Sequence, residues 1–239
     1  MKKMLEIRSL KAWYTPEKPV LKGLDLELNE YGVVGLIGLN GAGKTTLMNI
    51  ICGLHKGFEC DEMLMNGKSF SFGDKAFKKS RYIVFSEDES FGYFSFDEYL
   101  AYVFGCYGKT PDSGYIDELV ERFGFGEYRS MLIKDLSLGN RRKAYLITGF
   151  ALQPELLLLD EPVNGLDFTS TETLYSLIAG YKKFGTVLFS SHILESVTLT
   201  SDKVLVLENG VISKTYSGSE INAENIRASL GTEEAQGNV

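Results

Sequence analysis

The stretch that decides the fold is Val33-Val-Gly-Leu-Ile-Gly-Leu-Asn-Gly-Ala-Gly-Lys-Thr-Thr46. Residues 33–37 form a short continuous apolar run, which is typical of a strand buried on both faces of a parallel sheet. The residues that follow match the pattern G-x-x-x-x-G-K-[ST], which joins such a strand to a helix. The sequence therefore predicts an α/β core that begins with this strand, loop and helix.

The loop has the chemistry of a phosphate-binding site. Its glycines let backbone N–H groups turn toward phosphate oxygens, and the following helix points its positive end at them. Lys44 is expected on the β- and γ-phosphates and Thr45 on Mg²⁺. A glycine-rich turn without a ligand is the alternative, which the preceding buried strand disfavours. The residues predicted to contact a nucleotide here are Gly38, Asn40, Gly41, Ala42, Gly43, Lys44, Thr45 and Thr46.

Other segments extend the predicted core. Apolar runs at Leu156–Leu159 and Thr186–Phe189 predict further buried strands, each leading into a loop and a helix. The first 30 residues alternate instead, most clearly over 24–29, and predict a half-exposed antiparallel sheet. Asn209-Gly210, within the segment 204–212, predicts a hairpin because both residues tolerate positive φ. The expected fold is an α/β P-loop NTPase core with a mostly parallel sheet and an antiparallel β flank.

Residues from about 86 to 152 have helical periodicity instead. Ser95-Phe96-Asp97-Glu98 has the spacing of a capping box, which starts a helix. Apolar residues of Ile116–Phe123 recur at i, i+3, i+4 and i+7, and Gly124 is the expected stop. A further helix is expected at 138–152. The segment therefore predicts an inserted helical subdomain.

Composition argues against several classes of protein. The 239 residues contain 25 Lys plus Arg against 32 Asp plus Glu, a net charge of −7, whereas nucleic-acid-binding domains are normally basic. Apolar runs fall short of the roughly 18 to 20 residues that cross a bilayer, and Glu6 precedes any apolar signal core. We expect a cytoplasmic protein without nucleic-acid partners. One domain is expected over 1–217, followed by a polar, frayed tail over 218–239.

The cysteines point neither to a disulfide framework nor to a zinc site. The chain has three of them, an odd number, and none forms a C-x-x-C pair. We expect them to be reduced and partly buried. They are Cys52, Cys60 and Cys106.

Two carboxylates, Asp160 and Glu161, end the apolar run at 156–159. Ligands bind at the carboxyl ends of strands in open α/β sheets. Asp160 fits the Mg²⁺-linked carboxylate of a P-loop nucleotidase, and Glu161 can point the other way and polarise the attacking water. Two acids at a strand end can also be merely solvated. The phosphate-binding loop in the same chain favours the catalytic interpretation.

Motifs elsewhere resemble one family. Asp135-Leu136-Ser137-Leu138-Gly139-Asn140 is similar to the signature motif of ATP-binding cassette (ABC) ATPases, whose subunits drive membrane transporters. Asn164-Gly165-Leu166-Asp167 resembles the family's D-loop, and Ser190-Ser191-His192 resembles its switch histidine after a strand. Tyr14 resembles the aromatic residue that stacks on adenine. The resemblance extends from residue 5 to about residue 217.

The resemblance implies a role for each motif. Ser137 and Gly139 would direct a hydroxyl, backbone amides and a helix dipole at the nucleotide of a second subunit. Two such domains would close head to tail around two ATP molecules, with Asp167 communicating across the interface. His192 would hold the γ-phosphate and the attacking water. The implied catalytic residues are Glu161, His192 and Lys44, and the implied metal ligands are Thr45, Asp160 and Glu87.

The signature departs from the family's pattern. It usually runs Leu-Ser-Gly-Gly-Gln, and here Leu138 and Asn140 replace the first glycine and the glutamine. Ser137 and Gly139, which have the clearest reason to face phosphate, are retained.

A second departure concerns Mg²⁺. The family commonly has a glutamine that reaches the metal from the loop entering the helical insertion, whereas this chain has glutamine only at 153 and 236. Aligning Tyr82–Ser86 with the strand before that loop puts Glu87 in the position. A carboxylate there can bind Mg²⁺ or accept from water. Alternatively, Glu87 is one solvated member of the acidic run 87–89.

Adenine stacking has two candidates. Trp13 and Tyr14 are adjacent and face opposite sides of an extended segment, so that only one can stack on the base. Position favours Tyr14.

These features favour an ABC transporter ATPase subunit that uses ATP and Mg²⁺ and drives a separate membrane protein from the inner face of the membrane. Export is favoured over import because the chain ends soon after the hairpin. The expected dock is the 87–98 loop, rich in aromatic residues that could equally form the core of the helical insertion. Those aromatic residues are Phe91, Tyr93, Phe94 and Phe96.

Two other functions stay open. One is a soluble ABC ATPase acting in translation, repair or chromosome structure, although the chain lacks the second cassette or long heptad insertion of such proteins. The other is a different P-loop nucleotidase or a GTPase, which the 135–140 motif and His192 argue against. The dimer could consist of two identical or two unequal subunits.

Overall fold

The computed structural model of the protein describes residues 2–230. The predicted buried strand is β3 (Val33–Ile37), which lies inside a six-stranded sheet of order β11-β10-β3-β9-β8-β7. Every neighbouring pair in this sheet is parallel except β10 with β11. The other strands are β7 (Arg81–Val84), β8 (Leu156–Leu159), β9 (Thr186–Ser191), β10 (Lys203–Glu208) and β11 (Val211–Ser217). The predicted, mostly parallel sheet is confirmed.

Both faces of this sheet are buried, as the apolar runs predicted. In β8, Leu156 and Leu158 belong to one hydrophobic cluster, and Leu157 and Leu159 belong to another. The alternation follows from the two-residue period of a strand. Each face therefore packs against a different layer.

The layer on one face is the expected antiparallel sheet, of order β2-β1-β5-β6 with β4 paired to β1. Helix α1 (Lys44–Ile51), which follows the glycine-rich loop, shares a hydrophobic cluster with both sheets. The strands are β1 (Lys3–Trp13), β2 (Pro19–Asn29), β4 (Phe58–Glu59), β5 (Glu62–Met65) and β6 (Lys68–Ser69).

Arg81 links helix α1 and the short helix α2 (Lys75–Ser80) to the parallel sheet. It is 6% exposed and begins β7, directly after α2. Its guanidinium donates to the carbonyl oxygens of Phe77, at 2.6 Å, and Cys52, at 2.8 Å. One buried side chain thereby joins the ends of α1 and α2 to the parallel sheet.

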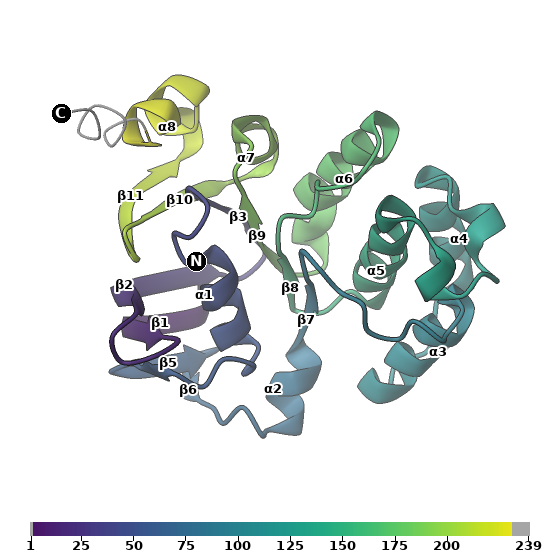
Figure 1. The fold of residues 1–239 in the computed structure, drawn as a ribbon, viewed down its shortest axis with the longest axis horizontal. Coiled ribbons are helices and arrows are strands. Elements are labelled where there is room, and N and C mark those ends of the chain that lie inside the picture. Colours follow the sequence, from purple (N-terminus) through teal and green to yellow (C-terminus); the bar gives the residue numbers. More distant parts are fainter. Residues whose placement is uncertain (1, 231–239) are drawn as a thin grey trace.

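The layer on the other face includes the predicted helical subdomain, on the right of Figure 1. Ser95 and Glu98 form the expected capping box, and Gly124 has φ of 58° after the second helix. Short 3-10 turns at 126–128 and 133–135 precede the third helix, which has its predicted bounds. The helices are α3 (Phe96–Tyr107), α4 (Ser113–Arg122) and α5 (Leu138–Leu152).

The last part of the chain contains one correction. The hairpin β10–β11 turns at Asn209 and Gly210, both with positive φ as predicted. The tail over 218–239 was expected to be frayed, but a 3-10 turn at 218–220 leads into α8 (Ala223–Leu230). The polar composition conceals this helix because few of its side chains reach the core, chiefly the fully buried Ile226 and the partly buried Leu230. Residues 231–239, the rest of the expected tail, lie outside the described residues.

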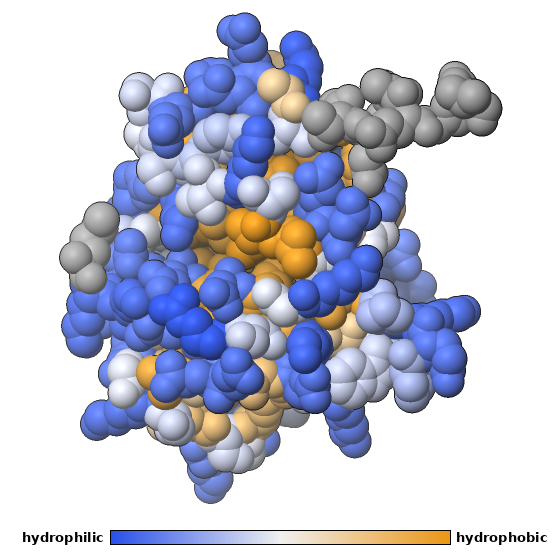
Figure 2. All heavy atoms as spheres, turned by 90° about the vertical axis from the view of Figure 1, so that its left-hand side faces the viewer, coloured by the Kyte–Doolittle hydropathy of each residue, from blue (hydrophilic) through white to orange (hydrophobic). Residues whose placement is uncertain are grey.

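Helices α6 (Phe168–Gly180) and α7 (Leu194–Thr200) complete the second layer. No helix between residues 2 and 230 combines the length and apolar character needed to cross a membrane. Figure 2 shows the face at the left of Figure 1, where an apolar recess interrupts a largely hydrophilic surface.

The three cysteines are free. Cys52 and Cys60 are half-buried, as expected, and Cys106 is exposed. The expectation is wrong for Cys106 because the buried positions of α3 repeat every three or four residues and position 106 falls off that face.

Candidate nucleotide-binding site

The loop between β3 and α1 is shaped by its glycines and closed by its lysine. Gly41 and Gly43 have φ of 83° and 108°, values that favour glycine. A Cβ on Gly38 would lie 2.3 Å from the carbonyl oxygen of Leu207. Lys44 is buried, and its Nζ donates to the carbonyl oxygens of Gly38, at 2.7 Å, and Leu39, at 3.2 Å. The loop thus holds a positive charge beside its backbone amides.

The predicted metal ligands Thr45 and Asp160 meet at the carboxyl end of β8. Thr45 Oγ1 donates to Asp160 Oδ2 at 2.8 Å, and Ser190 Oγ donates to Asp160 Oδ1 at 2.6 Å. Within residues 2–230, no group of three or more His, Cys, Asp or Glu could hold a metal ion by itself. One hydroxyl and one carboxylate nevertheless fit Mg²⁺, which normally takes few protein ligands and completes its shell with phosphate oxygens and water.

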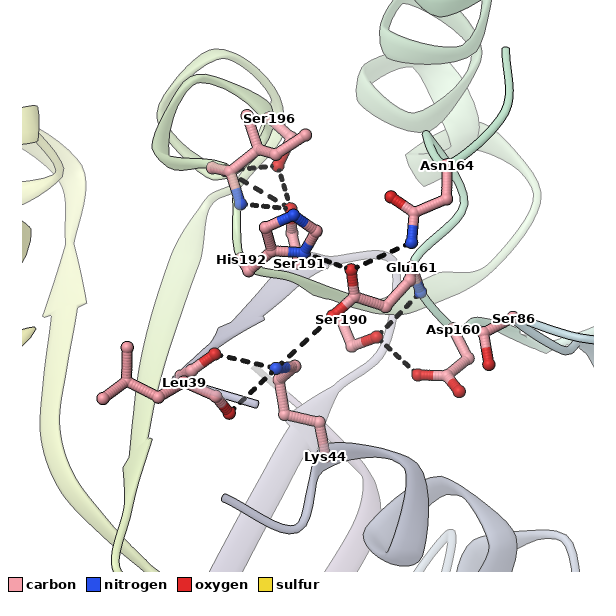
Figure 3. Close-up of polar contacts among 12 residues, drawn as sticks. Leu39, Lys44, Ser86, Asp160, Glu161, Asn164, Ser190, Ser191, His192 and Ser196 are labelled. Atoms are coloured by element: carbon pink, nitrogen blue, oxygen red, sulfur yellow. Dashed lines mark hydrogen bonds and ion pairs between the residues drawn. The ribbon is translucent and has the colours of Figure 1, made fainter. Parts of the chain in front are cut away.

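Glu161 occupies the centre of the site (Figure 3). Its carboxylate Oε1 lies 3.4 Å from Lys44 Nζ, and its Oε2 contacts His192 Nδ1. Asn164 Nδ2 donates to Oε2 at 3.4 Å. Glu161 has φ of 49°, and its N–H donates to Ser190 Oγ at 2.8 Å. The structure thus brings together the three residues expected to be catalytic.

A cavity opens beside these residues. It is lined by the glycine-rich loop and by Tyr14, Ser86, Glu87, Glu161, Asn164 and His192. Glu87 is exposed and also lines an adjoining hollow with Thr45 and Asp160. The loop position chosen from the sequence therefore lies beside the other two predicted metal ligands.

Tyr14 also lines the cavity and is 66% exposed. Its hydroxyl is 3.2 Å from Thr46 Oγ1, and its ring meets the ring of His55 edge-on. Trp13 instead pairs its backbone N–H with the carbonyl oxygen of Gly57 at 2.8 Å. Tyr14 is thus available to a planar ligand in the cavity.

The signature residues lie apart from this cavity, at the start of α5. Ser137 caps the helix by accepting the N–H of Asn140 at 3.2 Å. A Cβ on Gly139 would lie 2.4 Å from the carbonyl oxygen of Gly165, so this position is restricted to glycine by the D-loop. Leu138 is 60% exposed, which explains why a large side chain is accommodated where the family has glycine.

Three polar residues with roles in the site were missed from the sequence. Ser190 belongs to the motif that ends in His192, but the motif assigns it no role, and its hydroxyl binds both Asp160 and Glu161. Arg142 and Lys143 are buried in α5, although a run of basic residues in a helix normally indicates a solvated face. No local signal identifies them, because their partners are 18 to 56 residues distant in the chain.

Lys143 joins α5 to the D-loop. Its Nζ donates to Asp167 Oδ2 at 2.7 Å, and Asp167 Oδ1 accepts the N–H of Ser170 at the start of α6. The ammonium and, secondarily, this amide hold the pKa of Asp167 well below its usual range.

A buried strand, a phosphate-binding loop, a Thr–Asp pair and a carboxylate against a lysine together define a P-loop nucleotidase. Residues 21–164 match the profile of the ABC transporter family. The chain belongs to this family, as its motifs indicated.

Individual proteins similar to this chain belong to the same family. The chain is 36% identical over 217 residues to the putative ABC transporter ATP-binding protein AlbC of Bacillus subtilis (strain 168), covering 88% of this chain and 90% of that one. It is 30% identical to the lantibiotic transport ATP-binding protein SrtF of Streptococcus pyogenes, covering 91% and 93%. A solved structure of an ATP-binding subunit of an ABC transporter matches with a TM-score of 0.81 at 26% identity, covering 95% and 93%.

Proposed function

We propose that the protein hydrolyses ATP as one subunit of an ABC transporter and that the resulting motion drives a separate membrane protein. The observation that carries this proposal is the position of Glu161 between Lys44 and His192, beside the Thr45–Asp160 pair. A carboxylate placed this way can polarise a water against a phosphate held by the loop.

The residues divide the chemistry among them. Loop amides and Lys44 would bind the β- and γ-phosphates, while Thr45, Asp160 and Glu87 would hold Mg²⁺, which neutralises phosphate charge when bound. Lys44 has three N–H donors, of which two bind loop carbonyls. The third can go to Glu161 or to a phosphate. ATP therefore competes with Glu161 for Lys44 and leaves the carboxylate free to act on water.

Two such domains would complete each other's sites. Ser137 and Gly139 begin α5 away from the cavity that contains Lys44, which supports their use by a second subunit. Head-to-tail closure would bring this end of α5 to the partner's ATP. Two identical or two related chains could form this dimer.

The surface after β7 is the proposed dock for the membrane subunit. Phe96 is fully buried and belongs to the core, whereas Tyr93 is 80% exposed and Phe91 is partly exposed. The aromatic segment is therefore shared between the two expected roles. Phe91 and Tyr93 line a hollow with Lys134 and other residues, which suits a short helix of a partner. Docking here would hold the protein on the inner face of the membrane, where we propose that it powers export.

Replacing Glu161 with Gln tests the ATPase proposal. Glu161→Gln removes the base but keeps the shape, so hydrolysis should fall by at least about 100-fold. ATP binding should persist or tighten, because Gln competes less strongly for Lys44, and Mg²⁺-ATP should then trap a dimer. Phosphate release and light scattering measure the two effects.

Lys44→Ala is the companion variant. It should weaken nucleotide binding or turnover directly and should not trap a dimer. Rapid turnover by Glu161→Gln, or wild-type binding and turnover in Lys44→Ala, would overturn the proposal.

A further inference from the structure

Arg142 connects two segments of the site through hydrogen bonds to their backbone carbonyls. It is 4% exposed and lies on α5, a little beyond the signature residues. Its Nη1 donates to the carbonyl oxygens of both Asp160 and Glu161, at 3.3 Å each, and its Nη2 donates to the carbonyl oxygen of Ser86. Hydrogen bonds from a charged guanidinium are stronger than those between neutral groups. One buried cation thus holds the end of β8 to the end of β7.

Glu161 needs such support because its backbone is in the left-handed region, with φ of 49°. Residues with a Cβ adopt this conformation only where their surroundings impose it. The N–H of Glu161 donates to Ser190 Oγ at 2.8 Å, and its carbonyl accepts from Arg142 and from the N–H of Asn164. Without Arg142, this turn can relax and carry the carboxylate away from Lys44.

Arg142 also holds the loop that contains Glu87. Ser86, whose carbonyl accepts from Arg142, immediately precedes Glu87. One turn further along α5, the hydroxyl of Tyr145 donates to the carbonyl oxygen of Ser90 at 2.7 Å. Helix α5 therefore holds both ends of the segment 86–90.

We propose that Arg142 is a positioning residue, which fixes the Glu161 turn and the Glu87 loop in one arrangement relative to the signature helix. The inference rests on the proposed ATPase function. It needs an arginine, because a planar guanidinium presents separate nitrogens to two segments, whereas a lysine presents one.

Arg81 provides a matched control. It is buried to a similar degree, and its guanidinium also donates to carbonyls of two segments, but those segments lie outside the cavity. Arg142→Lys and Arg81→Lys should both lower thermal stability. Only Arg142→Lys should lower kcat, by at least about tenfold, while the Kd for ATP stays within about threefold of wild type.

Proteolysis supplies a readout that does not depend on turnover. A protease that cleaves after glutamate should cut at Glu87 or Glu89 faster in Arg142→Lys than in wild type or Arg81→Lys, because the loop has lost its tie to α5. If Arg142→Lys fails to fold, Tyr145→Phe removes only the hydroxyl that binds Ser90 and should also accelerate cleavage.

The outcomes separate the inference from the function on which it rests. Equal losses of kcat in Arg142→Lys and Arg81→Lys, or a loss of kcat without faster cleavage, would overturn the role of Arg142. If wild-type protein does not hydrolyse ATP, or Glu161→Gln hydrolyses it normally, the proposed function fails. The cleavage comparison still decides whether Arg142 positions the loop in that case.

Discussion

Some residues of this site can be identified from sequence motifs, whereas the roles of others become visible only in the folded structure. Lys44, Thr45 and Asp160 belong to patterns in which spacing implies chemistry. Ser190 and Arg142 act through backbone and side-chain contacts between distant segments, and Arg142 sits in a basic run that normally indicates a solvated face. The sequence therefore predicts the residues proposed to contact ATP better than the residues that hold them in position.

One prediction about single residues is that Tyr14, rather than Trp13, stacks on adenine. Tyr14→Ala should weaken ATP binding by about 1 to 3 kcal/mol, the usual contribution of stacking between a base and an aromatic ring. Trp13→Ala should bind ATP within about twofold of wild type, because Trp13 does not line the cavity. Titration with a fluorescent ATP analogue compares them. An equal or reversed order would contradict the assignment.

At the scale of elements, caps and periodicity predicted the helices well where several signals coincided. The capping box of α3 and the bounds of α5 agree with the structure. Helix α8 was missed because Ile226 gives too weak a pattern within a polar segment. Packing against core residues that are distant in the sequence, rather than local helix propensity, stabilises α8.

The ion pair between α5 and the start of α6 leads to a pH prediction. Because Lys143 lowers the pKa of Asp167, the pair stabilises the fold above the ordinary carboxylate pKa of about 4 and loses this effect as the pH falls through the lowered value. Asp167→Asn keeps an oxygen for the N–H of Ser170. It should lower stability by about 0.5 to 1 kcal/mol near neutral pH, because Asp167 is more than half exposed.

Urea denaturation between about pH 7 and pH 3 measures this difference, which should shrink below about pH 4. Glu172→Gln, which neutralises an exposed carboxylate on the same helix, is the control. A difference that stays constant or grows in acid would exclude the ion pair as its source.

For the whole molecule, the periods of apolar residues predicted both sheets and the helical insertion. The contacts that fasten the end of α1 to its surroundings could not be predicted, because they depend on isolated side chains. Arg81 is one, and Phe72 is another, since a Cβ on Gly53 would lie 2.7 Å from its ring. Such contacts leave no repeat in the sequence.

The proposed attachment to a membrane partner concerns the whole molecule. Wild-type protein should be recovered from cell extracts with an integral membrane protein, and Tyr93→Glu should lose it because a charge enters the aromatic dock. Tyr31→Glu changes another exposed tyrosine and should retain the partner. Recovery with ribosomes or DNA, and with no membrane protein, would support the soluble alternative.

The cavity has a consequence for the fold itself. Tyr14 follows β1 of the antiparallel sheet, whereas the phosphate-binding loop follows β3 of the parallel sheet. An ATP molecule with its adenine on one and its phosphates on the other would bridge the seam between them. By linkage, its binding free energy then adds to the cohesion of the two sheets. With ATP bound as proposed, the nucleotide concentration would thereby become one determinant of the stability of the fold.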